Sequence, residues 1–233
     1  MFYIPALDII SLTWFFAVWI GYTLYADRAS RRKRSLRAVM HVHRYQWMRR
    51  MLTRENRMSD AGIVGNLLRS VSFFASTTLL ILVGLVTLLG ATDKVIVLIR
   101  ELPFAAGMSL GQWELKLLVL IVIFVHAFFK FTWALREFNY CSVLIGAAPL
   151  PDRDSPPDEA YAARAAQIAT HASKDFNQGL RAYYFSLAAL AWFVHPAAFM
   201  LATTLVVAVL YWREYHSGTL SMLETSSAQR SGD

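Results

Sequence analysis

Long apolar stretches, separated by polar segments, are the dominant pattern of this chain. The hydrocarbon core of a bilayer is about 30 Å thick and needs roughly 20 apolar helical residues. Four windows reach that length, at about 5–26, 70–92, 113–135 and 182–212. The pattern predicts an all-α integral membrane protein whose four transmembrane helices form a single domain over 1–216, followed by a polar tail over 217–233.

The last two windows are less regular than the first two. The third contains Glu114, Lys116, His126 and Lys130, whereas the first contains only Asp8 and the second contains no Asp, Glu, Lys or Arg. The stretch between Arg181 and Arg213 also carries no such charge, but it is interrupted by Pro196. At about 1.5 Å per residue, this stretch is longer than a bilayer core. We therefore expect a tilted, bent or partly interfacial segment, and the pattern leaves open whether it is one helix.

Composition supports lipid as the solvent of this chain. Of its 233 residues, 56% are hydrophobic and 17% are charged, and the mean hydropathy is +0.40. Soluble domains carry about 25% charged residues. These values exclude disordered and collagen-like proteins, and the single cysteine, Cys141, excludes a disulfide scaffold.

The distribution of Lys and Arg predicts the orientation. Residues 27–70 carry twelve of them and residues 136–181 carry five, whereas four lie in the remaining segments outside the windows. Positive residues favour the cytoplasmic side of a membrane. We therefore expect a bacterial inner-membrane protein with cytoplasmic loops at 27–69 and 136–181 and with both termini in the periplasm. The first window is expected to be retained, because no Lys or Arg precedes it.

The first loop predicts a basic amphipathic helix over 31–52. Apolar side chains recur at spacings of three and four, and Trp47 lies among them. Such a helix can lie in the headgroup layer, where each Lys or Arg contributes about 1 kcal/mol near anionic lipid. Alternatively, the positive charge of this segment serves only to orient the protein in the membrane. We expect no nucleic-acid partner. The candidate lipid-headgroup residues are Arg31, Arg32, Lys33, Arg34, Arg37 and Trp47.

The second loop predicts another cytoplasmic helix. Ser155 is expected to cap it, with Pro156 in its first turn. The alanine-rich stretch from Ala160 to Gln178 presents a smooth apolar face, which suits close packing on the basic helix or on a neighbouring subunit.

Ionisable residues at membrane depth are the default functional candidates. His126, Lys130 and Glu137 share one face of the third helix, and Arg181, Tyr184 and His195 share one face of the fourth. Pro196 frees the carbonyl of Trp192, because proline has no N–H. A freed carbonyl near His195 suits an ion or ligand. The alternatives are a bare kink, a packed His126, and a Lys130 that snorkels or forms a structural ion pair.

Catalytic signatures are missing from the sequence. It contains no P-loop, no Gly-x-Ser-x-Gly and no Gly-x-Gly-x-x-Gly, so we name no catalytic residue. We also expect no metal and no cofactor. Two histidines on separate helices leave haem ligation as an alternative, without a supporting pattern.

Three stretches carry a family resemblance: 72–78, 129–140, and 176–185 followed by 191–196. Together they resemble the domain-of-unknown-function membrane family numbered five-ninety-nine, found in proteobacteria and plants. The resemblance implies a four-span integral membrane protein and transfers no catalytic residue. Its matching positions are Lys130, Arg136, Asn139, Asn177, Arg181 and Tyr184.

These positions predict a cluster at the cytoplasmic ends of the third and fourth helices, with Glu137 and Asp175 available to pair with its cations. The cluster suits an anionic headgroup, the inner mouth of an anion path, or a structural latch. Three functions stay open: a non-catalytic scaffold or accessory subunit, a small oligomeric channel or transporter, and a haem or metal protein. The expected partners are anionic lipid headgroups and further membrane subunits, including copies of this chain.

Overall fold

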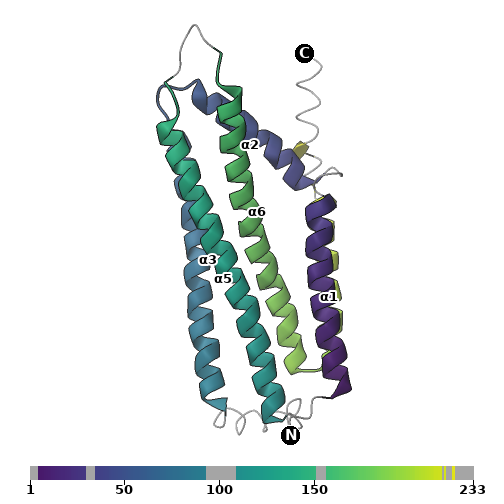
Figure 1. Cartoon of the computed structure of the whole chain (residues 1–233). Coiled ribbons are helices and arrows are strands. Elements are labelled where there is room, and N and C mark those ends of the chain that lie inside the picture. Colours follow the sequence, from purple (N-terminus) through teal and green to yellow (C-terminus); the bar gives the residue numbers. More distant parts are fainter. Residues whose placement is uncertain are drawn as a thin grey trace. The chain divides into compact units, whose positions relative to one another are not determined.

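The computed structural model describes residues 5–29, 35–92, 109–150, 156–216, 218 and 222–223. These residues form no strand, and the prediction of an all-α protein is confirmed. Figure 1 shows the course of α1, α2, α3, α5 and α6. The elements are α1 (Ala6–Ala29), α2 (Leu36–Leu52), α3 (Met58–Gly90), α5 (Leu110–Ala147), α6 (Glu159–Leu190), a 3₁₀ turn at Ala191–Phe193 and α7 (Pro196–Tyr215).

Four helical segments are long and apolar enough to cross a membrane, as predicted. They are Ala6–Arg28, Met58–Gly90, Leu110–Ala147 and Pro196–Tyr215. At about 1.5 Å per residue, the 33 residues of α3 extend about 50 Å and the 38 residues of α5 about 57 Å. Both helices are longer than a hydrocarbon core of about 30 Å.

The chain divides into two compact units. The first unit comprises Met1–Asp27, Ser76–Phe129 and Gln178–Tyr211, and the second comprises Arg28–Ala75, Lys130–Asn177 and Trp212–Asp233. Helices α3, α5 and α6 each contribute residues to both units.

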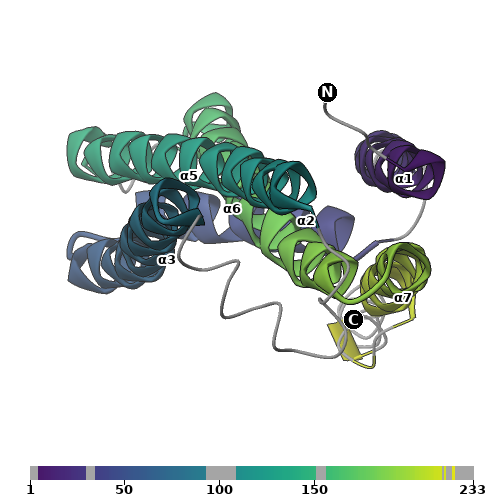
Figure 2. The same ribbon diagram turned by 90° about the horizontal axis from the view of Figure 1, so that it is seen from below.

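Aromatic side chains dominate the core of the first unit. The ring centroid of Phe15 in α1 lies 5.8 Å from that of Phe185 in α6 and 4.9 Å from that of Phe199 in α7. Phe199 in turn stacks on Trp192 at 5.1 Å. Aromatic pairs of this kind contribute about 0.5–1.5 kcal/mol beyond their buried area. These contacts hold α1 and α7 side by side, as Figure 2 shows.

Alanines dominate the core of the second unit. Met48, Met51 and Leu52 of α2 are buried in one cluster with four alanines of α6 (Ala162, Ala165, Ala166 and Ala169). Small side chains allow the backbones of two helices to approach closely. The predicted packing of the alanine-rich helix on the basic helix is confirmed.

Side-chain caps set the starts of α2 and α6. The Oγ atom of Ser35 accepts a hydrogen bond from the N–H of Ala38 at 3.3 Å. Asp158 accepts one from the N–H of Tyr161 at 2.9 Å, so α6 begins after Asp158. The prediction that Pro156 lies in the first helical turn was wrong, because Asp158 supplies the cap and the helix begins at Glu159.

Several predictions fall outside the described residues. They include the proposed cap Ser155, the cations Arg31, Arg32, Lys33 and Arg34, and most of the tail at 217–233.

The window at 182–212 is not one helix. Helix α6 ends at Leu190, and α7 begins at Pro196 after the 3₁₀ turn. Proline is well suited to the first helical position, because its missing N–H has no partner there. The Nδ1 atom of His195 accepts a hydrogen bond from the N–H of Ala197 at 3.1 Å and so caps α7.

Candidate functional site

The break between α6 and α7 places a charged side chain on a free carbonyl. Pro196 has no N–H to donate to the carbonyl of Trp192. The Nζ atom of Lys116, on α5, donates to that oxygen instead, at 2.8 Å. The same Nζ lies 5.5 Å from the ring centroid of Trp192 and 5.8 Å from that of Phe193. Both distances are within the range of cation–π attraction.

An acidic side chain of α1 lies on the other side of Trp192. The Oδ1 atom of Asp8 accepts a hydrogen bond from the indole Nε1 at 2.7 Å, and its Oδ2 accepts one from Nε2 of Gln112 at 3.1 Å. Asp8 is 4% exposed, Lys116 5% and Trp192 1%. Buried charges are costly unless they are hydrogen-bonded. We call Asp8, Gln112, Lys116 and Trp192 the Trp192 cluster.

Sequence reasoning found the free carbonyl but not its partner. The sequence predicts that this carbonyl, near His195, suits an ion or ligand. In the structure His195 is exposed and caps α7. The same pattern marks Lys116 only as a charge within the third window, and Asp8 only as the charge of the first. A charge in an apolar helix and a carbonyl freed by proline are the two signals that together point to this contact.

The other predicted residues of the first unit have separate surroundings. His126 is exposed and makes an edge-to-face contact with Trp19 at 5.5 Å. Arg181 is buried and pairs with Asp27 at 3.7 Å. Tyr184 is 40% exposed and therefore does not share the buried face of Arg181.

The second unit contains the remaining predicted residues. The Nζ atom of Lys130 on α5 lies 3.0 Å from Oδ1 of Asp175 on α6, which gives this cation one of the two partners considered for it. Asn139 is exposed and Asn177 is half-buried. The resemblance therefore pointed to residues in both units.

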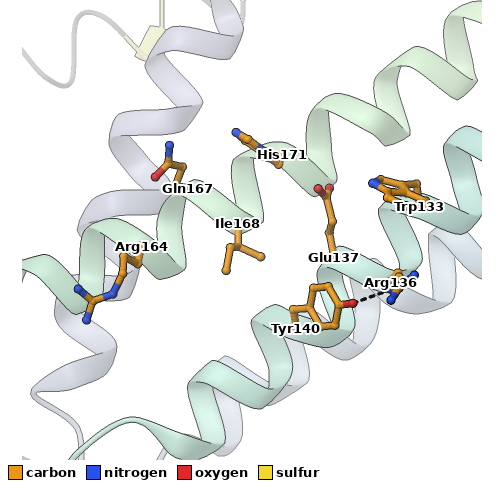
Figure 3. A pocket seen from close by; sticks show the side chains of 8 residues that line it. All are labelled: Trp133, Arg136, Glu137, Tyr140, Arg164, Gln167, Ile168 and His171. Atoms are coloured by element: carbon orange, nitrogen blue, oxygen red, sulfur yellow. Dashed lines mark hydrogen bonds between the residues drawn. The ribbon is translucent and has the colours of Figure 1, made fainter.

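Arg136 and Glu137 line a pocket of about 580 Å³ in the second unit. Its α5 wall consists of Trp133, Arg136, Glu137 and Tyr140, and its α6 wall consists of Arg164, Gln167, Ile168 and His171. Figure 3 shows the carboxylate of Glu137 directed from α5 toward α6. The Nε atom of Arg136 donates to the hydroxyl of Tyr140 at 2.5 Å, and its guanidinium lies over the rings of Trp133 and Tyr140.

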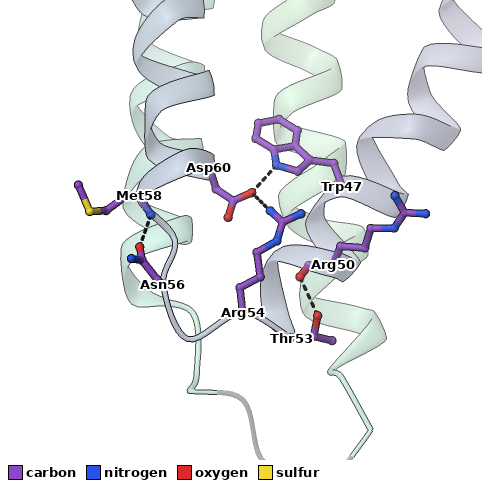
Figure 4. Close-up of polar contacts among 7 residues, drawn as sticks. All are labelled: Trp47, Arg50, Thr53, Arg54, Asn56, Met58 and Asp60. Atoms are coloured by element: carbon purple, nitrogen blue, oxygen red, sulfur yellow. Dashed lines mark hydrogen bonds and ion pairs between the residues drawn. The ribbon is translucent and has the colours of Figure 1, made fainter.

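Asp60 joins the C-terminal end of α2 to α3. Its Oδ1 atom accepts hydrogen bonds from Nε1 of Trp47 at 2.7 Å and from Nη1 of Arg54 at 2.5 Å, as Figure 4 shows. The side chain of Asp60 is fully buried. Trp47, predicted to dip into the headgroup layer, therefore contacts α3 in this structure. Arg37 on the same helix pairs with Glu214 at 3.3 Å.

Arg57 joins the start of α3 to the end of α5. Its guanidinium donates to the carbonyl of Ala148 at 2.6 Å and also to that of Pro149. The last carbonyls of a helix lack intrahelical partners and carry partial negative charge, so a cation there is stabilising. Sequence reasoning counts Arg57 only as one of the twelve loop cations.

Glu159 joins the start of α6 to α2. It accepts a hydrogen bond from the hydroxyl of Tyr45 and pairs with Arg49 at 2.6 Å. The hydrogen bond to the carboxylate raises the pKa of Tyr45, because it stabilises the protonated phenol. We call the contacts of Asp60, Arg57 and Glu159 the three polar ties.

Comparison with known proteins assigns the family. The family described as "Protein of unknown function, DUF599" matches residues 10–219, and the chain belongs to this family. No curated protein matches the chain, and no solved structure matches it. Within the described ranges, no group of three His, Cys, Asp or Glu side chains is placed to hold a metal ion.

Proposed function

We propose that this DUF599 protein is a non-catalytic scaffold or accessory subunit of the bacterial inner membrane, with α2 as its docking helix. The observation that carries the proposal is the set of three polar ties. They hold α2 against α3 and α6, and α3 against α5, by charged side chains as well as by apolar packing. A helix fixed in advance loses little conformational entropy when a partner binds it.

The outer face of α2 supports a partner with an acidic surface. Val42, Arg49 and Arg50 are exposed. Val42 is 52% exposed and adds apolar contact area among these cations. Exposed cations steer an acidic partner toward the helix.

The proposed topology places α2 in the cytoplasm. Its support is the Lys and Arg count, with seventeen residues in the two long loops and four in the remaining segments outside the windows. Tags at the two ends should both be reached by a periplasmic protease in spheroplasts. Protection of either tag would overturn this topology.

A site-specific crosslinking experiment tests the scaffold role. A photoreactive residue at position 42 should capture one protein in a fixed ratio. Position 80 on α3 is the control, since Leu80 is also exposed but lies on an apolar helix. The proposal requires that substituting Arg50 by Gln weakens the capture at position 42 while leaving the purified chain folded. Capture of that protein from position 80 as well, or recovery of only a homo-oligomer, would contradict it.

A second function, transport of an ion or small anion, is favoured by the Trp192 cluster. Transporters place their sites where membrane helices are interrupted, with charges near the free helix ends. The break between α6 and α7 has this form, and Lys116 and Asp8 are buried beside it. Purified protein in liposomes should then pass an ion, and Lys116→Met should abolish the flux in protein that remains folded. Absence of flux over a panel of halides, phosphate and monovalent cations would exclude this function.

A further inference from the structure

The pocket between α5 and α6 in the second unit combines one carboxylate with two guanidinium groups. The Oε2 atom of Glu137 is buried and has no hydrogen-bond partner among the residues that the structure describes. A buried carboxylate oxygen without a donor is costly. A ligand that brings a positively charged donor to this oxygen would remove that cost.

Two arginines in the pocket are held in place by aromatic rings. The guanidinium of Arg136 lies 5.6 Å from the ring centroid of Trp133, and its Nε is bonded to Tyr140. Arg164 lies over the ring of Tyr161 at 5.8 Å. These contacts use the planar faces of the two guanidinium groups and the Nε atom of Arg136. The terminal Nη atoms therefore remain available to donate hydrogen bonds to a ligand. A fixed guanidinium fork matches the oxygens of a phosphate.

The two kinds of group together select a zwitterion. A simple anion would meet the carboxylate of Glu137, and a simple cation would meet Arg136 and Arg164. A phosphate ester that carries a primary amine satisfies both kinds of group, since its ammonium pairs with Glu137 and its phosphate with Arg136. The pocket volume is about 580 Å³. A volume of this size is typical of sites for small ligands.

The surface beside the pocket favours a lipid as the source of this chemistry. Trp133 is 55% exposed, Tyr140 47% and Val143 67%. Their spacing places them on one face of α5, a helix that is long and apolar enough to cross a membrane. Aromatic side chains of this kind gather where headgroups meet the hydrocarbon core. The acyl chains of a lipid would cover this face, whereas a soluble ester would leave it uncovered.

We propose that this pocket binds the headgroup of an aminophospholipid, with the ammonium on Glu137 and the phosphate on Arg136. The inference is independent of the scaffold role, because it uses no surface of α2.

Lipid retention in native mass spectrometry tests the proposal. Full-length protein in neutral detergent is offered phosphatidylethanolamine or phosphatidylglycerol, which both carry a phosphate but differ in the amine. The wild type should retain phosphatidylethanolamine in preference. Glu137→Gln should lower that preference about tenfold or more, as loss of one charge-assisted hydrogen bond implies. The matched control Glu55→Gln changes an exposed carboxylate outside the pocket and should keep the preference.

A second pair of variants tests the phosphate end. Arg136→Gln should lower retention of both lipids, whereas Arg69→Gln, an exposed cation on α3, should not. Equal retention of the two lipids by the wild type overturns the proposal, even if Glu137→Gln does not fold. Displacement of the lipid by an equal concentration of glycerophosphoethanolamine would overturn the lipid assignment in favour of a soluble ester.

Discussion

Lys116 donates a hydrogen bond to the carbonyl oxygen of Trp192 over 2.8 Å, in the position where a continuous helix would place the N–H of residue 196. A lysine of α5 thus completes the backbone bonding at the end of α6. Backbone groups away from water must be satisfied within the protein, so a helix break in lipid requires such a partner.

Replacing Lys116 by Met should destabilise the protein. The substitution keeps much of the side-chain volume but leaves the Trp192 carbonyl unpaired and buried, at a cost of about 1–3 kcal/mol. Unfolding in detergent, followed by helical circular dichroism, measures the change. Leu118→Met, at an exposed position two residues away, serves as a control that should leave the free energy of unfolding nearly unchanged. An unchanged stability for Lys116→Met would show that the lysine bond is dispensable.

Pro196→Ala should partly rescue the Lys116→Met variant. Alanine supplies the N–H that can donate to the carbonyl of Trp192 if the helix becomes continuous. The two substitutions share one acceptor, so their effects should be non-additive by about 1 kcal/mol or more in a double-mutant cycle. Additive effects would mean that the packing of Trp192 and Phe199 holds the break between α6 and α7. Competition of Lys116 and residue 196 for the Trp192 carbonyl oxygen would then play no part.

The helical organisation was largely predictable, because each spanning helix needs a long apolar stretch. The spacing of three and four over 31–52 also predicted α2, which begins at Leu36. The alanines predicted a packing face on α6 but left open whether α2 or a neighbouring subunit covers it. The start of α6 was not predictable in detail, since Ser155 and Asp158 are both good caps and only the packing of the helix selects one.

The polar contacts were harder to predict because their partners are distant in sequence. The pair Lys130–Asp175 spans 45 residues and Asp8–Trp192 spans 184. Helical periodicity places a residue on a face but gives no information on which helix covers that face. Only the carbonyl of Trp192 had a local signal, because a proline four residues later always removes its partner.

Replacing Arg57 by Gln should loosen the end of α5. The guanidinium donates to the carbonyls of Ile145, Ala148 and Pro149. A glutamine cannot replace these bonds, because it is shorter and carries no charge. We expect a loss of about 1.5–3 kcal/mol, the range for hydrogen bonds to a charged group. Arg50→Gln changes an exposed cation of α2. It should alter stability by less than about 0.5 kcal/mol. Similar effects of the two substitutions would contradict a capping role for Arg57.

The Tyr45–Glu159 contact should weaken at alkaline pH. The pKa of Tyr45 is raised in the folded state. This contact therefore contributes stability below the unfolded pKa of about 10 and loses it as pH rises through the folded value. The difference between the phenolate absorbance titrations of wild type and Tyr45→Phe isolates this group. Glu159→Gln should return its midpoint toward the ordinary value, and a midpoint unaffected by that change would show that the carboxylate does not hold the phenol.

Variants of the pair Lys130–Asp175 distinguish a structural latch from a ligand site. The side chains are 31% and 15% exposed. A pair with this exposure should contribute about 1 kcal/mol or less. If it is a latch, Lys130→Met and Asp175→Asn should each lower the free energy of unfolding, and the double variant should lose no more than the larger single effect.

If Lys130 instead holds an anion, Lys130→Met should leave the unfolding free energy nearly unchanged and reduce retention of phosphatidylglycerol, while Asp175→Asn should increase that retention. Unfolding and lipid retention measured on the same preparations separate the two roles, because only the latch predicts matched losses of stability on both sides of the ion pair.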